Sequence, residues 1–422
     1  MTYARALAAL AARGETRIEL GLDRLRAHLA RLGNPQEKIP AFHVAGTNGK
    51  GSTCAILASV LSASGRRTGL YTSPHLISPR ERVRVDGEPI SERAFARAVE
   101  EALAADPRGE LTYFELMTSA AFLHFARARC EVAVLETGLG GRLDATNVVR
   151  APLAAVVASI GLDHQAYLGN TLAAIAAEKA AIFKPGRPAV YPRWLPASAR
   201  AVVARAARRA RPAPVARSWR TIRVDWRAGA QILRSTDGCE HRLGILGARQ
   251  GRNAALARAA LDASGLEFSR EAWRRGLERV RWPARFEPVR LGARTLIVDG
   301  AHNPEAAAAL AETWRASPWS RAPARWILGL LRDKDARGVF RPLAPFLREV
   351  VVVRAPSPRA REPMDLAREV RLAAPRARVS VEPSVERALA AWRADARAPR
   401  AAVCAGSLYL AGAALKACGR RA

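Results

Sequence analysis

The sequence predicts an α/β protein: a parallel-sheet domain with a phosphate loop, followed by a smaller, Rossmann-like doubly wound α/β domain. Two observations carry this prediction. Short aliphatic runs of strand length alternate with helical stretches along most of the 422 residues, which is typical of parallel sheets covered on both faces. A glycine-rich segment containing one lysine joins the first of these strands to its helix, as in many phosphate-binding sites.

The first part of the chain alternates apolar strands with helices that have one apolar face. We expect strands at 39–44, 68–72, 132–136, 155–160 and 189–191, and helices at 53–62, 95–104, 111–129 and 171–183. Residues 194–241 are basic, irregular and contain several prolines. We therefore expect this stretch to leave the sheet, with antiparallel strands near 221–224 and 231–234.

A domain boundary is expected near residues 281–285, because a fresh alternation of strands and helices begins after them. The predicted domains are residues 1–285 and 286–422. In the second domain we expect strands at 295–298, 326–330, 350–353, 379–381 and 402–405, and helices at 304–314, 364–372, 385–392 and 408–416.

The glycine-rich segment runs from His43 to Thr53. Its glycines let backbone N–H groups surround phosphate oxygens, Lys50 adds a positive charge, and a hydroxyl group can reach Mg²⁺. The match to G-x-x-x-x-G-K-[ST] is imperfect, because Val44 occupies the first glycine position and Gly51 separates Lys50 from Ser52. A plain turn between strand and helix is the alternative, but the pattern favours a nucleotide site.

Composition narrows the functional class. Hydrophobic residues make up 49% of the chain and charged residues 25%, as in ordinary globular proteins. We expect a cytoplasmic protein, because the sequence has no 18-residue apolar run, no signal-peptide layout and no C-x-x-C pair among its five cysteines.

The net charge of +30 comes almost entirely from arginine, since only six of the 68 basic residues are lysine. This bias resembles codon usage more than a nucleic-acid surface, for which residues 200–223 are the one candidate. We expect no nucleic-acid partner, and the charge instead favours polyanionic small molecules.

Polar clusters follow the predicted strands at 71–76, 136–147 and 163–164, whereas Glu178-Lys179 lies inside a predicted helix. Ligands gather at the carboxyl ends of strands in open α/β sheets. Ser73, Glu136 and His164 are therefore candidate Mg²⁺ ligands. Each also has an ordinary alternative, namely a helix cap, an edge-strand charge and a hydrogen-bonded turn residue.

Together, nine ordered segments resemble the dihydrofolate synthase/folylpolyglutamate synthase family of the Mur ligase superfamily. The resemblance covers almost the whole chain, and the family has the same glycine after the loop lysine. It implies a Mur ligase-type ATPase domain followed by a glutamate-ligase domain. The segments are HVAGTNGKGS (43–52), YTSPHL (71–76), ERVRVDGEPI (81–90), ETGLGGRLDATN (136–147), IGLDH (160–164), EKAAIFKPG (178–186), VDGAHNP (298–304), GLLRDKD (329–335) and AGSLYL (405–410).

The resemblance implies that ATP and Mg²⁺, with two metal ions expected, are bound by residues from both domains. Lys179 matches a carbamylated lysine, a modification that turns a cation into an anion able to support a second metal ion. Lys50, Lys179 and His164 are the expected catalytic groups. The implied ATP-binding residues are Asn48, Gly49, Lys50, Gly51, Ser52, Asn253, Arg285 and Asp299, and the implied metal ligands are Ser73, Glu136, His164 and Lys179.

The resemblance also implies a dihydropteroate pocket, made of Thr112, Tyr113, Phe114, Glu115, Leu143, Asp144 and Ala145. An aromatic ring at 113 or 114 would stack on the pterin, and the carboxylate at 144 or 115 would accept hydrogen bonds from it. Alternatively, both aromatic residues belong to the core of their helix. The chain departs from the family at Arg249, where a histidine is usual, and at Ala181, where glycine is frequent.

The implied reaction is ATP-dependent amide formation. A substrate carboxylate attacks the γ-phosphate, giving an acyl phosphate and ADP, and the amine of L-glutamate then displaces phosphate. We expect a monomer that accepts both dihydropteroate and tetrahydrofolate, binds no membrane, and closes about a hinge during turnover, with His302 either lining the cleft or forming a helix-start turn.

Three alternatives remain for the function. The first is a folylpolyglutamate synthase only. A peptidoglycan-precursor Mur ligase would need a uridine-nucleotide domain before the loop, where only 42 residues precede His43. A non-catalytic ATP-dependent nucleic-acid binder rests on charge alone.

Overall fold

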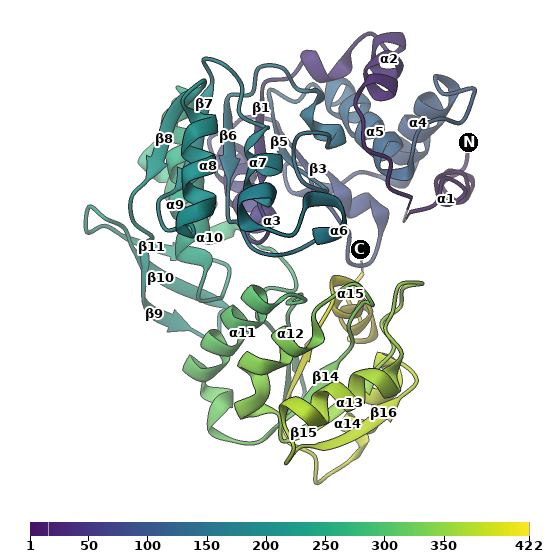
Figure 1. Ribbon diagram of the computed structural model, residues 1–422, viewed down its shortest axis with the longest axis vertical. Coiled ribbons are helices and arrows are strands. Elements are labelled where there is room, and N and C mark those ends of the chain that lie inside the picture. Colours follow the sequence, from purple (N-terminus) through teal and green to yellow (C-terminus); the bar gives the residue numbers. More distant parts are fainter. Residues whose placement is uncertain (16, 422) are drawn as a thin grey trace.

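The computed structural model describes residues 1–15 and 17–421. The chain forms two lobes (Figure 1), an N-terminal lobe drawn in purple to teal and a C-terminal lobe drawn in green to yellow. We call these the N-lobe and the C-lobe. The N-lobe is built on an eight-stranded sheet of order β4-β3-β2-β5-β1-β6-β7-β8, and the C-lobe on a six-stranded sheet of order β12-β13-β17-β14-β15-β16.

Six strands of the N-lobe sheet are parallel, and β3 and β4 extend it as an antiparallel edge. The central strands β1 and β5 are buried at every position, as their apolar sequences require. Their carboxyl ends therefore meet at one edge of the sheet. The strands are β1 Ala41–Ala45, β2 Thr68–Tyr71, β3 Val83–Val85, β4 Glu88–Pro89, β5 Val132–Glu136, β6 Ala154–Val157, β7 Pro188–Pro192 and β8 Arg211–Val215.

Helices cover both faces of this sheet. One hydrophobic core lies under α4 and α5, with α1 and α2 beside them, and another lies under α3, α9 and α10. A smaller core joins α7 and α8 to the sheet. The helices are α1 Tyr3–Ala11, α2 Asp23–Arg31, α3 Lys50–Ala63, α4 Glu92–Ala104, α5 Tyr113–Arg127, α6 Gln165–Leu168, α7 Leu172–Ala180, α8 Ala197–Ala207, α9 Gln250–Ser264 and α10 Arg270–Arg279.

The C-lobe is doubly wound, with one core under α11, α12 and α13 and another under α14 and α15. Its strands are parallel except for the edge strand β12. The strands are β12 Glu287–Leu291, β13 Arg294–Val298, β14 Ala324–Leu328, β15 Glu349–Val353, β16 Arg378–Glu382 and β17 Ala401–Ala405. The helices are α11 Pro304–Ala316, α12 Ala336–Leu343, α13 Pro363–Ala373, α14 Val385–Ala394 and α15 Leu408–Ala417.

A three-stranded antiparallel sheet reaches from the N-lobe towards the C-lobe (Figure 1). Its strands are β9 Arg220–Asp225, β10 Ala230–Arg234 and β11 Glu240–Leu243. Directly after β9, the ring of Trp226 lies 5.8 Å from the rings of both Phe286 and Trp319. Leu233 and Leu243 of the same sheet belong to the N-lobe core under α3, so this small sheet packs against both lobes.

Most predicted elements are present, but the expectation for residues 194–241 was partly wrong. The two antiparallel strands exist, yet the stretch also contains α8 and the edge strand β8 of the main sheet. Alanine and arginine favour helix formation, and α8 was missed because the stretch was interpreted by its charge and prolines instead. Pro212 and Pro214 hid β8, although proline is tolerated in an edge strand. The sequence analysis did not predict the helices α1, α2, α6, α9, α10 and α12 or the strands β3, β4, β11 and β12; Pro342 inside α12 obscured that helix.

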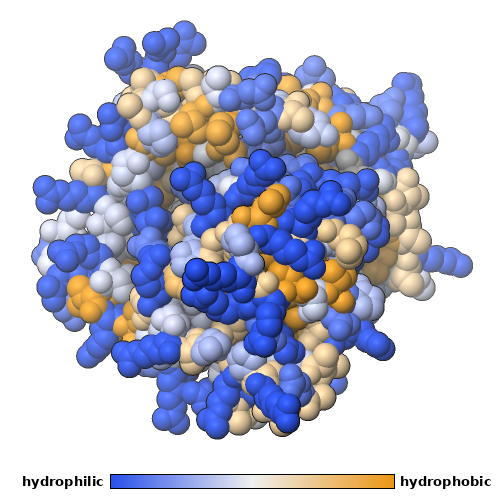
Figure 2. All heavy atoms as spheres, turned by 60° about the horizontal axis from the view of Figure 1, so that its bottom comes forward, coloured by the Kyte–Doolittle hydropathy of each residue, from blue (hydrophilic) through white to orange (hydrophobic). Residues whose placement is uncertain are grey.

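The surface is mainly polar. Hydrophilic side chains cover most of the face drawn in Figure 2, and hydrophobic ones form small groups between them. None of the helices among residues 1–15 and 17–421 is long and apolar enough to span a bilayer.

Candidate functional site

The glycine-rich loop connects β1 to α3 and needs glycine at two positions. Gly49 has φ 83° at the start of α3, and a Cβ there would lie 2.5 Å from Asn253 Oδ1. A Cβ at Gly51 would lie 2.9 Å from Trp282 Nε1. The glycine after the lysine therefore leaves room for a tryptophan from the segment between the lobes.

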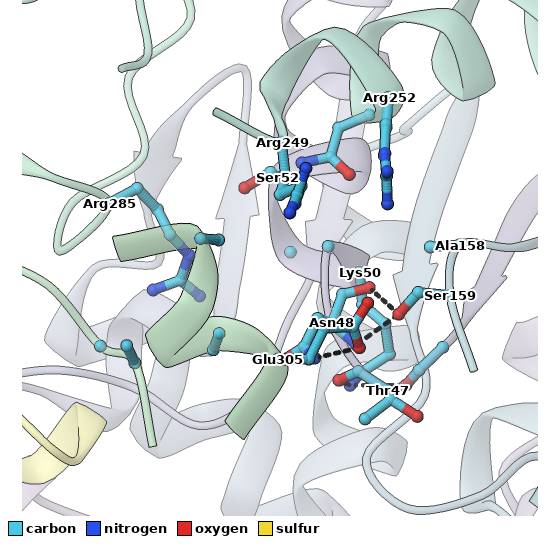
Figure 3. Close-up of a pocket in the computed structure, with 18 of the residues that line it drawn as sticks. Thr47, Asn48, Lys50, Ser52, Ala158, Ser159, Arg249, Arg252, Arg285 and Glu305 are labelled. Carbon is cyan, nitrogen blue, oxygen red and sulfur yellow. Dashed lines mark hydrogen bonds between the residues drawn. The ribbon is translucent and has the colours of Figure 1, made fainter. Parts of the chain in front are cut away.

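A cavity of about 260 Å³ opens over this loop and is lined by both lobes. Figure 3 shows the loop side chains together with Arg249, Arg252 and Arg285. The structure brings together every residue that the sequence analysis assigned to ATP or metal. These residues are Asn48, Gly49, Lys50, Gly51, Ser52, Ser73, Glu136, His164, Lys179, Asn253, Arg285 and Asp299.

Ser73, Glu136 and His164 come from three separate segments at the carboxyl edge of the sheet. Ser73 follows β2 and donates its backbone N–H to Glu136 Oε2 (3.2 Å), and Glu136 is the last residue of β5. His164 precedes α6 with φ 51°, in the left-handed region. Burial raises the pKa of Glu136, and the nearby Lys50 opposes this shift.

These residues fit Mg²⁺ only in part. The described residues contain no group of three or more His, Cys, Asp and Glu side chains placed to hold a metal ion. The protein would thus offer one carboxylate, one imidazole and one hydroxyl group. Phosphate oxygens and a carbamylated Lys179 would supply the remaining oxygen ligands that Mg²⁺ prefers.

Lys179 lies near the end of α7, and only 4% of its surface is exposed. Its Nζ donates to the backbone oxygen of Gly46 (3.1 Å), which also accepts a hydrogen bond from Lys50 Nζ (3.0 Å). Burial lowers the pKa of Lys179 to about 7, and the charge of Lys50 adds to this shift. Near neutral pH, a large fraction of this amine is therefore uncharged.

Arg285 enters the cavity from a strained turn. Its neighbours Ala284 and Phe286 have φ values of 56° and 45°, which non-glycine residues rarely adopt. Asp299, just after β13, stabilises the turn by accepting hydrogen bonds from the N–H groups of Phe286 and Ala301, both 2.8 Å. Burial raises the pKa of Asp299, while Arg285 opposes the shift.

Arg249, the departure from the family pattern, also lines this cavity. It precedes α9, and its guanidinium forms an ion pair with Glu312 of α11 in the C-lobe (3.0 Å). Arginine in place of the family's usual histidine thus puts a permanent positive charge at the nucleotide cavity.

A second cavity, of about 780 Å³, adjoins the first. It contains six of the seven residues assigned to the pterin pocket: Thr112, Phe114, Glu115, Leu143, Asp144 and Ala145. Tyr113 does not line it. This ring is buried in the core, with the guanidinium carbon of Arg82 5.1 Å from its centre.

The two candidate pterin-binding carboxylates have different surroundings. Glu115 forms a capping box with Thr112 at the start of α5 and an ion pair with Arg24 (2.9 Å). Asp144 accepts hydrogen bonds from the backbone of Leu139 (2.8 Å) and from the backbone and hydroxyl groups of Thr146 (3.0 and 2.5 Å). Burial raises the pKa of Asp144, whereas these hydrogen bonds favour its charged form.

The two cavities meet at residues that line both, among them Asp163, His164, His302 and Glu305. The Lys334 ammonium contacts Asp163 at 2.6 Å. Although burial opposes it, the imidazole of His302, 3.7 Å away, and the charge of Lys334 hold the pKa of Asp163 well below its ordinary value. His302 thus lies in the cleft.

The sequence analysis missed Lys334, Asn303 and Glu305 as site residues. The motif segment 298–304 contains Asn303 and the segment 329–335 contains Lys334, but nothing in the sequence indicated Glu305.

Two family comparisons cover most of the chain. The Mur ligase middle domain matches residues 44–261, and the Mur ligase glutamate ligase domain matches residues 284–408. The chain therefore belongs to the Mur ligase family.

Individual relatives confirm the narrower resemblance. The dihydrofolate synthase/folylpolyglutamate synthase of Bacillus subtilis is 38% identical over 365 residues, covering 83% of this chain and 84% of the relative. The protein of the same name from Escherichia coli is 40% identical, covering 76% of this chain and 75% of the relative.

Solved structures agree across nearly the full length. Mycobacterium tuberculosis folylpolyglutamate synthase, complexed with ADP and AMPPCP, has a TM-score of 0.88 at 33% identity and covers 99% of both chains. Escherichia coli FolC in complex with DHPP and ADP has a TM-score of 0.85 at 34% identity, covering 99% of this chain and 97% of that one. A bifunctional folylpolyglutamate synthase/dihydrofolate synthase with Mn, AMPPNP and L-glutamate bound has a TM-score of 0.84 at 32% identity, covering 100% of this chain and 98% of that one.

Proposed function

We propose that this protein is an ATP-dependent ligase that joins L-glutamate to dihydropteroate and to reduced folates. The observation that carries the proposal is the junction of two cavities, one over a phosphate loop and one lined by an aromatic ring and a buried carboxylate. An acceptor carboxylate in the second cavity would thereby face the terminal phosphate of a nucleotide in the first. The bound nucleotides, DHPP and glutamate of the similar structures support this arrangement.

The chain's own residues contribute mainly position and charge, as phosphoryl transfer requires. In the proposed arrangement, residues 48–52 and Asn253 hold the nucleotide, and Asp299 keeps Arg285 directed at it. Lys50 and Arg285 neutralise negative charge at the phosphates while the acceptor carboxylate attacks in line. The products are ADP and an acyl phosphate, from which the amine of L-glutamate displaces phosphate.

Mg²⁺, when bound, supplies further charge neutralisation at the phosphate oxygens. Ser73, Glu136 and His164 would hold one ion and a carbamylated Lys179 a second. Carbamylation joins the neutral amine to CO₂ and releases one proton. The buried position of Lys179, which lowers its pKa to about 7, supports this assignment.

Phe114 and Asp144 are the proposed pterin contacts. Phe114 offers a ring inside the cavity, and the hydrogen bonds at Asp144 oppose the effect of burial and fix the carboxylate as an acceptor for amino groups. Tyr113 then supports the pocket from the core.

We further propose that the protein is a cytoplasmic monomer with two domains, residues 1–285 and 286–422.

The test is phosphate release with ATP and L-glutamate, comparing dihydropteroate, tetrahydrofolate and no acceptor. Both acceptors should give glutamate-dependent turnover well above the reaction without acceptor. Turnover with tetrahydrofolate alone would reduce the protein to a folylpolyglutamate synthase, and no glutamate-dependent turnover with either acceptor would contradict the proposal.

A further inference from the structure

The phosphate loop is hydrogen-bonded to the opposite lobe through the side chain of Asn48 (Figure 3). Its Nδ2 donates to Glu305 Oε2 (2.9 Å) and to Asn303 Oδ1 (3.3 Å). Its Oδ1 accepts a hydrogen bond from Asn303 Nδ2 (3.0 Å). Both partners lie at the start of α11 in the C-lobe, so these contacts require the two lobes to be together.

The backbone of Asn48 is held on its own side of the cleft. Its N–H donates to Ser159 Oγ (2.8 Å), and its carbonyl oxygen accepts from the same hydroxyl group (3.0 Å). All four hydrogen-bonding groups of Asn48 therefore have partners within the protein. The side chain of Asn48, a residue of the loop, is thus also arranged to link the two lobes.

Gly161 makes room for the carboxylate that Asn48 contacts. A Cβ at this position would lie 2.8 Å from Glu305 Oε2, whereas its next neighbour, Thr47 Cγ2, would be at an ordinary 3.6 Å. The backbone groups of Gly161 are both bonded to Thr47 Oγ1 (3.0 and 3.1 Å), which fixes this residue against the phosphate loop. A side chain at this position would therefore displace the Glu305 carboxylate.

We propose that Glu305 is a positioning residue: through Asn48 it couples nucleotide binding at the phosphate loop to closure of the two lobes. The contact forms only in the closed arrangement, so it stabilises closure and the loop conformation together. By linkage, losing it weakens nucleotide binding even though Glu305 need not touch the nucleotide. The inference rests on the proposed function, because it assigns the nucleotide to this loop.

Three variants of the contact test the proposal by the KM for ATP and kcat. Glu305→Ala removes the hydrogen bond and should raise KM for ATP about tenfold, as expected for a hydrogen bond to a charged group. Glu305→Gln keeps an acceptor oxygen in place and should stay within about threefold of the original KM. Gly161→Ala displaces the same carboxylate from the other side, so its KM for ATP should rise about as much as that of Glu305→Ala.

The double variant Gly161→Ala/Glu305→Ala gives the sharpest readout, because alanine at 161 meets no carboxylate once Glu305 is gone. Its KM should equal that of Glu305→Ala alone, an extreme case of non-additivity between contacting residues. Additive effects, or an unchanged KM in Glu305→Ala, would overturn the proposal. If Glu305→Ala fails to fold, Gly161→Ala still reports on the same contact.

Glu312→Ala is the matched control. Glu312 lies on the same helix and also pairs across the lobes, with Arg249, but its side chain is half exposed and does not contact the loop. The KM for ATP of Glu312→Ala should change less than about twofold. A rise equal to that in Glu305→Ala would show that any ion pair or hydrogen bond between the lobes has this effect, and it would overturn a role specific to the phosphate loop.

Calorimetric titration with ADP separates this inference from the proposed function. ADP affinity should fall about tenfold in Glu305→Ala and in Gly161→Ala even if no ligase activity is found. If the unmodified protein shows no ligase activity but the two variants bind ADP more weakly as expected, only the proposed function is overturned. An unchanged ADP affinity in an active enzyme would overturn only the coupling.

Discussion

Two lysine side chains approach the same backbone carbonyl, that of Gly46, although they come from different helices. Lys50 begins α3, and Lys179 is buried near the end of α7. Two ammonium groups so close repel each other, which favours the neutral form of the more buried one. The site therefore assigns them different chemistry: Lys50 carries charge, and Lys179 can react as an amine.

Lys50→Ala should reduce glutamate-dependent phosphate release by at least about a hundredfold, because it removes a preorganised charge at the phosphates. Stability should change little, since the Lys50 side chain only donates to loop carbonyls. Lys38→Ala, which removes an exposed lysine outside both cavities, is the control. A folded Lys50→Ala enzyme with near-normal turnover would remove this loop from the reaction.

Enzyme freed of CO₂ should lose activity and regain it with bicarbonate, faster at pH 8 than at pH 6 when the concentration of dissolved CO₂ is held equal. The pKa of Lys179 is lowered to about 7, so the neutral amine that reacts with CO₂ increases as pH rises through 7. The measurement is activity against time after bicarbonate addition. Lys179→Ala should not respond to bicarbonate, and short carboxylic acids should partly restore its activity; a fully active Lys179→Ala enzyme would exclude the carbamate.

Helices α3 and α10 pack at a position where no side chain fits between them. A Cβ at Gly276 would lie 2.5 Å from Val60 Cα and 2.7 Å from Val60 Cγ2. Ser59 Oγ also donates to the Gly276 carbonyl oxygen (2.7 Å). Since α3 carries the phosphate loop at its start, this close contact also fixes the direction of the loop.

Gly276→Ala should lower the free energy of unfolding by about 1–3 kcal/mol, because the overpacking outweighs the better helix propensity of alanine. Urea unfolding measures this change. Arg279→Ala, at an exposed position of the same helix, should stay within about 0.5 kcal/mol of the original protein. A stabilised Gly276→Ala protein would show that α10 can move away from α3 at little cost.

The sequence predicts elements and sites well where the signal is local. Buried parallel strands such as β1 and β5 read as apolar runs, and Glu136 stands out because it ends one of them. The contact between Asn48 and Glu305 has no local signal, since 257 residues separate the two and only docking of the lobes joins them. Likewise, local sequence cannot decide between Tyr113 and Phe114, because one helical step separates the core from the cavity.

Buried histidines affect the stability of the whole molecule. Burial lowers the pKa of His43 to about 3 and also lowers that of His28. Both side chains are fully buried and form hydrogen bonds in their neutral forms, His43 with Thr146 (2.7 Å) and His28 with Ser119 (2.8 Å). Acid therefore protonates them far more easily in the unfolded chain than in the folded one.

Stability should decrease as pH falls below about 6.5, where the unfolded histidines bind protons and the folded ones do not. Each such group contributes a slope of up to about 1.4 kcal/mol per pH unit, and for His43 the loss continues towards pH 3. Urea midpoints from pH 7.5 to 4.5 measure it, and a smaller slope is expected in His43→Gln. A flat profile down to pH 4.5 would contradict this prediction.

The scarcity of lysine makes the three lysines of the site informative. Of six lysines in the chain, Lys50, Lys179 and Lys334 line the two cavities, while arginine fills nearly every other cationic position. Arginine cannot lose its proton near neutral pH and needs more space than an ammonium group. Arginine is thus the usual cationic residue in this chain. We therefore expect lysine at these three positions because each needs a compact amine or one that can lose its proton.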